Sequence, residues 1–163
     1  MSTLNPYEKF LDERSIEDTL AATPKTLAEL IESIGPARSA APPAPGKWSP
    51  AEIVAHLADC ELVFAFRLRQ GVAQEHHTMQ PFDQDEWAKQ YAGYTAQEAL
   101  ATFRTMRQWN IVFLKSLPEA AFDKPVTHPE RGTMTLRTIV ETMGGHDRNH
   151  VKQAVAIAEK ARS

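Results

Sequence analysis

Hydrophobic side chains recur every three or four residues over most of the chain, which is the spacing that places them on one face of an α-helix. This pattern predicts four long helices, over residues 16–34, 49–70, 95–116 and 135–161. Ser49 with Glu52 and Thr95 with Glu98 have the spacing of a capping box, and Pro50 suits the first position of a helix. We find no strand-like alternation of useful length.

Prolines and glycines mark the expected interruptions. Pro24 falls inside the first helical stretch, and with Thr23 as a candidate N-cap it predicts that a fresh helix starts there. Residues 35–47 contain four prolines and are predicted to form a loop, as are residues 121–133. A short helix is predicted over residues 83–90, within the polar connection between the second and third long helices.

Four long amphipathic helices in a chain of 163 residues favour an all-α fold, a four-helix bundle that forms a single domain over residues 1–163. The connection between the second and third helices is about two dozen residues long, which exceeds the usual bundle loop. That length permits a crossover along the bundle instead of a simple hairpin, and it supplies residues that could cover one end.

Composition and charge exclude several classes of partner. The net charge of −3 and the absence of a basic cluster argue against a nucleic-acid partner, because phosphate binding needs a clustered basic surface. No apolar stretch is long enough to span a bilayer, and the N-terminus lacks the pattern of a signal peptide, so no membrane partner is expected. The single cysteine, Cys60, fits a reducing compartment, and we expect a cytoplasmic protein.

Histidines interrupt the apolar faces of two predicted helices. His146 and His150 lie four residues apart on one face of the last helix, and His56 lies on the inner edge of the second helix. Two imidazoles from one helix and one from another could hold a divalent metal ion and leave a position open, as in catalytic sites. The competing interpretation is a set of core histidines without a metal.

Other polar residues on the inner faces are candidates for supporting roles. Asp59, one turn after His56, and Asp147 could orient an imidazole, and Asn110 could form hydrogen bonds in a pocket. Three arginines could bind carboxylates of a substrate, although a salt bridge is the commoner explanation: Arg67, Arg107 and Arg148. The polar residues that interrupt the apolar faces of the third and fourth helices cluster near mid-helix, so together they predict a wet pocket inside the bundle: Arg107, Asn110, His146, Asp147 and His150.

The remaining histidines, the glycine pair and the thiol are weaker candidates. Three histidines lie in predicted loops, where solvated side chains are normal: His76, His77 and His128. Gly144 and Gly145 indicate either close helix packing or space beside the histidines. Cys60 lies one turn from His56, but a small core thiol is favoured over a nucleophile. Asp147 replaces the glutamate of the zincin motif, so that chemistry is not expected.

Four segments together resemble the DinB/YfiT-like superfamily: residues 46–59 (GKWSPAEIVAHLAD), 81–87, 128–132, and His146 with His150. The resemblance covers residues 46–152, and within the superfamily it is nearest to the YfiT-type metal-dependent hydrolases and bacillithiol transferases. It implies a bundle of up-down-down-up connectivity. It also implies a nickel or zinc ion on His56, His146 and His150, and a homodimer.

The resemblance implies a metal-dependent transfer of a low-molecular-weight thiol, such as bacillithiol, mycothiol or glutathione, to an electrophilic small molecule. Two alternatives stay open: a hydrolase that uses water activated by the metal, and a metal- or small-molecule-binding stress protein without turnover. The sequence does not identify the metal, because three imidazoles suit nickel, zinc, copper or iron.

Overall fold

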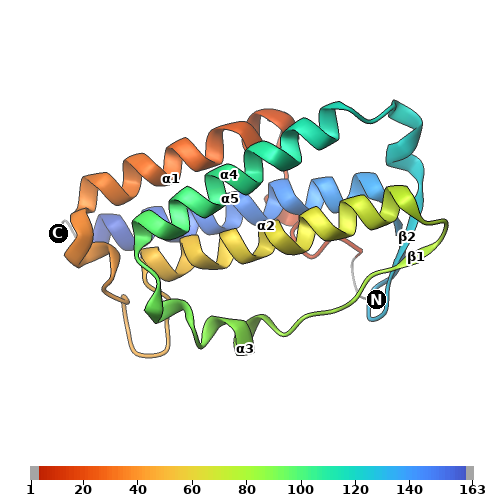
Figure 1. The fold of residues 1–163 in the computed structure, drawn as a ribbon. Helices are drawn as coiled ribbons and strands as arrows, with labels where there is room; N and C mark the ends of the chain where they lie inside the picture. Colours follow the sequence, from red (N-terminus) through yellow and green to blue (C-terminus); the bar gives the residue numbers. More distant parts are fainter. Residues whose placement is uncertain (1–3, 161–163) are drawn as a thin grey trace.

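Four long helices make up the body of the computed structural model, which describes residues 4–160: α1 (Ile16–Ser39), α2 (Pro50–Ala73), α4 (Ala96–Lys115) and α5 (Leu136–Lys160). Helices α1 and α5 run in one direction along the bundle, and α2 and α4 run in the other (Figure 1). The connectivity is therefore up-down-down-up. The predicted all-α four-helix bundle is confirmed.

Helices α2 and α4 begin where their capping boxes predict. The hydroxyl of Ser49 accepts a hydrogen bond from the backbone N–H of Glu52 (3.2 Å), and the Glu52 carboxylate accepts one from the Ser49 N–H (2.7 Å). Thr95 and Glu98 form the same reciprocal pair at the start of α4. Each cap satisfies backbone donors that the first turn leaves unpaired, which is worth about 1 kcal/mol. These boundaries are therefore set locally.

Helix α1 continues through Pro24, so the prediction of a fresh helix at that residue is wrong. Thr23 is buried inside the helix and its hydroxyl donates to the carbonyl of Thr19 (2.8 Å) instead of capping. Proline has no N–H to give the Leu20 carbonyl one turn earlier. The guanidinium of Arg107, on α4, donates to that carbonyl (3.0 Å). A contact distant in sequence thus replaces the missing helical hydrogen bond.

The connections hold more regular structure than the sequence predicts. Residues 35–39 continue α1 beyond Gly35, whose φ of 75° marks a kink, so the loop begins later than expected. The predicted short helix is confirmed as α3 (Gln84–Ala88). Residues 119–135 contain a 3-10 turn (Glu119–Asp123) and two strands, β2 (Pro125–His128) and β3 (Gly132–Thr135).

A small three-stranded sheet closes one end of the bundle. Strand β1 (His77–Thr78) pairs in parallel with β2, and β2 pairs antiparallel with β3. The prediction of no strands is therefore wrong, because strands of two to four residues are too short to show an alternating pattern. The crossover between α2 and α4 runs back along the bundle from β1 through α3 (Figure 1).

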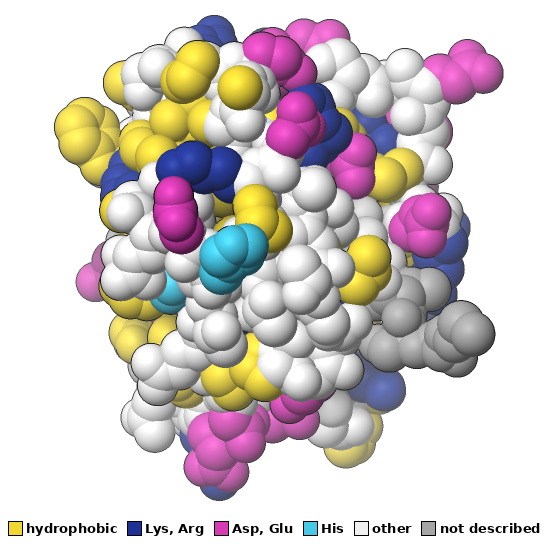
Figure 2. All heavy atoms as spheres, turned by 90° about the vertical axis from the view of Figure 1, so that its right-hand side faces the viewer, with side chains coloured by type: hydrophobic (Ala, Val, Ile, Leu, Met, Phe, Trp, Pro, Cys, Tyr) yellow, Lys and Arg dark blue, Asp and Glu magenta, His cyan; other side chains and the backbone are white. Residues whose placement is uncertain are grey.

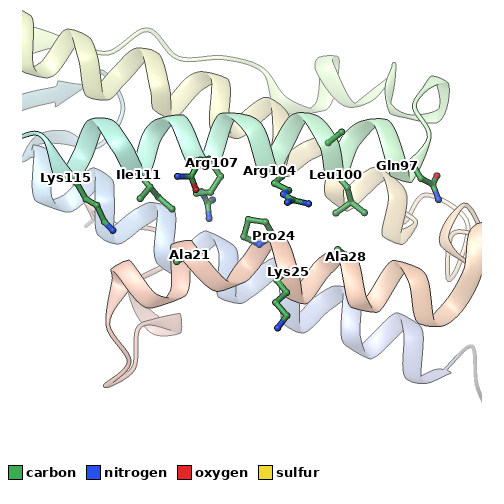
Figure 3. A pocket seen from close by; sticks show the side chains of 12 residues that line it. Ala21, Pro24, Lys25, Ala28, Gln97, Leu100, Arg104, Arg107, Ile111 and Lys115 are labelled. Atoms are coloured by element: carbon green, nitrogen blue, oxygen red, sulfur yellow. The ribbon is translucent and has the colours of Figure 1, made fainter.

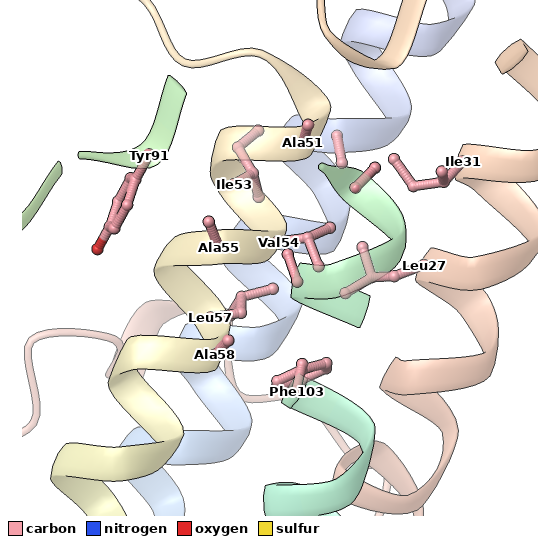
Figure 4. Close-up of a cluster of buried hydrophobic side chains, with 13 residues drawn as sticks. Leu27, Ile31, Ala51, Ile53, Val54, Ala55, Leu57, Ala58, Tyr91 and Phe103 are labelled. Atoms are coloured by element: carbon pink, nitrogen blue, oxygen red, sulfur yellow. The ribbon is translucent and has the colours of Figure 1, made fainter. Parts of the chain in front are cut away.

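The apolar interior divides into two clusters. In the first, Leu57 of α2, Leu27 of α1 and Phe103 of α4 pack together with their neighbours (Figure 4). The second, on the side of the sheet, includes Leu68 of α2 and Met143 of α5. On α4 and α5 the buried polar residues fall, in sequence, between the members of the two clusters, and on α2 Glu61 lies next to Cys60, where the second cluster begins. The bundle therefore carries a polar layer near its middle.

Arg107 is the centre of that layer. Its side chain is 2% exposed and donates to both carboxylate oxygens of Asp147 (2.6 and 2.9 Å) and to Glu61 (2.7 Å). Asn110 donates to the second oxygen of Glu61 (2.9 Å). Burial opposes the charge of Arg107, but the two carboxylates outweigh it and raise its pKa. With the bond to Leu20, this guanidinium links its own helix, α4, to each of the other three long helices.

Within residues 4–160, no helix combines the length and the hydropathy needed to cross a membrane. At the end of the bundle that carries the sheet, acidic and basic side chains are intermixed over the surface (Figure 2).

We expect Arg107→Met to lower the free energy of unfolding by about 3–5 kcal/mol, because it leaves two buried carboxylates without a counter-charge. Urea denaturation followed by circular dichroism measures this. The matched control is Arg137→Met, since Arg137 pairs with Glu119 at the exposed surface and should contribute less than about 1 kcal/mol. Equal losses in the two variants would contradict the central role of Arg107.

Candidate metal centre

Three histidines from two helices meet in the interior. His56 lies on α2, and His146 and His150 lie one turn apart on α5; their exposed fractions are 1%, 4% and 6%. One ring nitrogen of each lies within 4.8 Å of the other two, and the Nε2 atoms of His56 and His146 are 3.0 Å apart. The structure thus brings together the three residues that the sequence singles out, while their role as metal ligands stays a prediction.

The environment keeps these imidazoles neutral. Burial lowers the pKa of all three, and that of His56 falls to about 3, with a further contribution from His150. His150 also faces Gln153, whose side-chain oxygen lies 3.0 Å from Nδ1 and accepts a hydrogen bond from the Nδ1–H group, which leaves Nε2 with a free lone pair. Neutral imidazoles are the form that binds metal ions.

The cluster fits a divalent ion. With metal–nitrogen bonds of about 2.0–2.1 Å, a tetrahedral ion separates two ligand nitrogens by about 3.4 Å, which is close to the observed approach of His56 to His146. Three imidazoles occupy three positions and leave at least one for another ligand. Three imidazoles therefore suit a divalent ion, and this set of ligands does not distinguish nickel, zinc, copper and iron.

Aromatic side chains enclose the histidines, and the sequence pattern does not reveal them. Trp48, which precedes the capping residue of α2, packs on His56 with ring centroids 4.8 Å apart and also faces His150 at 6.4 Å. Tyr7, from the N-terminal segment, meets His146 edge-on at 4.9 Å. Only the sequence adjacency of Trp48 to the cap could have placed one of these rings near the site.

The glycine pair explains how the N-terminal segment reaches α5. A Cβ atom at Gly145 would lie 2.6 Å from the backbone oxygen of Tyr7, and one at Gly144 would lie 2.8 Å from the side chain of Ile16. The close-packing interpretation of the pair is therefore the one that the structure supports, and this packing seats Tyr7 beside His146.

Several predicted pocket residues lie elsewhere. Asp147 and Arg107 form the buried ion pair described above, and Asn110 belongs to the same network through Glu61. Arg148 donates to the carbonyl of Arg14 (2.8 Å) and to a threonine hydroxyl of α1. The prediction of a wet pocket that contains Asp147, Arg107 and Asn110 is therefore wrong, because these three belong to one hydrogen-bonded network within the packed bundle.

Two further candidates stay close to His56. Asp59 is half-buried near Tyr91, and burial raises the pKa of its carboxyl. The sulfur of Cys60 lies 3.5 Å from Nε2 of His56, and burial raises the pKa of this thiol well above its usual value. That shift disfavours the thiolate and supports the interpretation of Cys60 as a core thiol. The orienting role of Asp59 stays a prediction.

A cavity of about 340 Å³ leads from His146 and Cys60 towards the sheet. Its walls come from α2, α5, the N-terminal segment, the crossover and the β2–β3 turn, and include Tyr7, Phe64, Arg67, Phe82, His128 and Arg131. His128 is 5% exposed, so the expectation of a solvated loop histidine is wrong for this residue. His76 is exposed as expected, and His77 is half-buried.

A larger groove of about 710 Å³ lies between α1 and α4, where Pro24, Arg104 and Lys115 are among its lining residues (Figure 3). None of the three clustered histidines lines this groove, whereas His146 lines the smaller cavity. We therefore assign the smaller cavity to the candidate site, because a reacting molecule must approach the histidines.

The comparisons with known proteins agree with this architecture. A family model described as the DinB superfamily matches residues 19–154. A relative from Bacillus mycoides, named "Putative metal-dependent hydrolase", is 22% identical over 156 residues. The alignment covers 94% of this chain and 88% of the relative.

Two solved structures share the fold. YfiT from Bacillus subtilis superposes with a TM-score of 0.82 at 19% identity, over 92% of this chain and 91% of its own. A mycothiol-dependent maleylpyruvate isomerase superposes with a TM-score of 0.66 at 14% identity, over 95% of this chain. The present chain covers 62% of that isomerase.

We expect the metal-free protein to lose stability as the pH falls from about 6.5 towards 3. The folded imidazoles have lowered pKa values, so the unfolded chain binds more protons in that window and stability rises with pH. His56→Gln should reduce the slope by up to about 1.4 kcal/mol per pH unit. Urea denaturation of chelator-treated protein between pH 7 and 4 measures it.

The control for this series is His76→Asn, because His76 is exposed and asparagine tolerates its positive φ of 52°. The control should keep the slope of the unmodified chain. A His56→Gln slope equal to that of the control would show that the buried imidazole is not what resists protonation.

Proposed function

Because the chain belongs to the DinB superfamily, we propose that it is a metal-dependent enzyme that transfers a low-molecular-weight thiol to an electrophilic small molecule. The observation that carries the proposal is the convergence of three buried, neutral imidazoles, one of which, His146, lines a cavity. The known proteins add support, since a structural neighbour is mycothiol-dependent and sequence relatives carry the name of metal-dependent hydrolases.

Each part of the site has a defined task in this proposal. His56, His146 and His150 would hold a nickel or zinc ion, which when bound favours deprotonation of a thiol or water molecule. Gln153 fixes the ring of His150 by accepting a hydrogen bond from its Nδ1–H group. Trp48 covers two of the imidazoles and excludes water from that side. The cavity beside His146 holds the electrophile within reach of the thiol.

Thiol transfer is favoured over hydrolysis because of the carboxylates. Water attack on an ester or amide is assisted by a general base near the metal. Both oxygens of Asp147 accept hydrogen bonds from Arg107. Among the described residues that line the cavity, Glu130 alone carries a carboxylate, and it is exposed. A thiol is far more acidic than water, so a thiol bound to the metal would lose its proton to solvent and needs no base in the site.

The homodimer stays a prediction.

We expect about one nickel or zinc ion per chain in untagged protein, and loss of that metal in His146→Ala, because one of the three ligands is removed. Inductively coupled plasma mass spectrometry measures the content. His76→Asn serves as the control and should retain the metal. If metal is absent from the unmodified chain after reconstitution with nickel or zinc, the histidines have a structural role.

We expect the metal-loaded protein to accelerate the reaction of 1-chloro-2,4-dinitrobenzene with at least one of glutathione, cysteine, bacillithiol and mycothiol. His150→Ala should reduce this rate about 100-fold or more while circular dichroism shows the fold retained, and His76→Asn should keep it. Product absorbance gives the rate. Hydrolysis of p-nitrophenyl acetate without thiol conjugation would favour the hydrolase, and neither activity would favour the non-catalytic binding protein.

A further inference from the structure

The arginines of the interior differ in what they contact. Arg107 and Arg148 are paired with acidic side chains and backbone carbonyls. Arg67 is only 9% exposed, and among the described residues its one hydrogen bond runs from Nη2 to the carbonyl of Gln80 (3.1 Å). Its Nε, like that of Arg107, is buried without a hydrogen-bond partner there, but Arg67 also lacks the ion pairs that Arg107 forms. A buried guanidinium without a counter-charge is costly, so this residue needs an explanation.

A second arginine faces the same space. Arg131, in the turn between β2 and β3, lines the 340 Å³ cavity together with Arg67. Burial lowers the pKa of Arg67, and the charge of Arg131 lowers it further. Burial and both arginines also lower the pKa of His128, the third basic group of the lining. Exposed Glu130 offsets part of this charge, so the cavity keeps a positive surplus.

The remaining lining residues and the cavity volume indicate the size and polarity of a suitable ligand. Phe64, Phe82 and Tyr7 supply aromatic walls, and the guanidinium of Arg67 lies 5.7 Å from the centre of the Phe82 ring. The volume is at the lower end of the range for small-molecule sites. A planar guanidinium fork matches a carboxylate. A small molecule with a carboxylate at one end and an apolar part at the other would therefore match the arginines and the aromatic walls of this cavity.

We propose that Arg67 and Arg131 bind a carboxylate of one of the two reactants in the cavity beside His146. The proposal rests on the proposed function for what happens to the bound molecule, but the binding itself uses residues that are separate from the three histidines. A bound carboxylate gives the two positive charges of Arg67 and Arg131 a counter-ion. The bound carboxylate would fix the distance between the reacting atom and His146, so Arg67 and Arg131 act as specificity-determining residues.

The test is a titration of 15N-labelled protein with 3-phenylpropionate and with its neutral isostere 3-phenylpropionamide, followed by NMR. We expect the carboxylate to bind at least about tenfold more tightly than the amide, since hydrogen bonds to charged groups are the stronger ones. Arg67→Met and Arg131→Met should each remove that preference. The control Arg137→Met, at an exposed ion pair, should keep it.

Arg131 is half-buried in a turn, so its variant tests the proposal even if Arg67→Met fails to fold. Equal affinity for acid and amide, no binding of either, or an unchanged preference in Arg131→Met would overturn the proposal. The titration is repeated on metal-free protein, where the preference should persist. If the protein prefers the carboxylate but binds no metal, the proposed function is contradicted and this inference stands. If it binds metal but shows no preference for the carboxylate, this inference is contradicted and the proposed function stands.

Turnover then identifies which reactant brings the carboxylate. If it is the electrophile, 4-chloro-3-nitrobenzoate should have a KM at least about tenfold below that of its methyl ester, and Arg131→Met should abolish the difference. If it is the thiol, glutathione should show that advantage over its diethyl ester instead. A protein that conjugates all four compounds with equal KM values would contradict the proposal.

Discussion

The architecture depends on one buried guanidinium. Arg107 joins Glu61 of α2 and Asp147 of α5 and donates to the backbone of α1, so the relative positions of all four long helices are fixed at one level. His146 directly precedes Asp147, and its partner His56 lies 90 residues away in sequence. The pairing of Asp147 with α4 therefore also sets how His146 faces α2. An ion pair of this kind contributes little net stability, but its geometry allows few alternatives.

The buried polar layer around Arg107 separates two chemical environments, and helix geometry explains how. Consecutive residues on a helix point about 100° apart, so Asp147 joins the closed network while His146 reaches the cavity. On the network side every charge has a partner nearby. On the cavity side, neutral imidazoles and an arginine without an ion pair leave polar groups available for ligands. The residues that stabilise the bundle and those that face the cavity therefore lie on different faces of a single helical turn.

The sequence predicted those features that are encoded over a few residues. The capping boxes located the starts of α2 and α4, and the spacing of His146 and His150 placed both on one helix face. Features that depend on distant partners were missed. Tyr7 beside His146 requires the docking of the N-terminal segment on Gly145, and the strands become visible only through their pairing. The polar residues of α4 gave no sign of whether they would face a pocket or each other.

Pro24 shows how such a distant dependence limits sequence change. An alanine at this position would give Leu20 its ordinary helical hydrogen bond, and the carbonyl, which has two lone pairs, could accept it alongside the bond from Arg107. Loss of Arg107 beside Pro24 would instead leave that carbonyl without a donor inside the bundle. Arg107 keeps its bonds to Glu61 and Asp147 whichever residue stands at position 24. The dependence therefore runs one way: position 24 accepts proline while position 107 carries a donor that reaches Leu20.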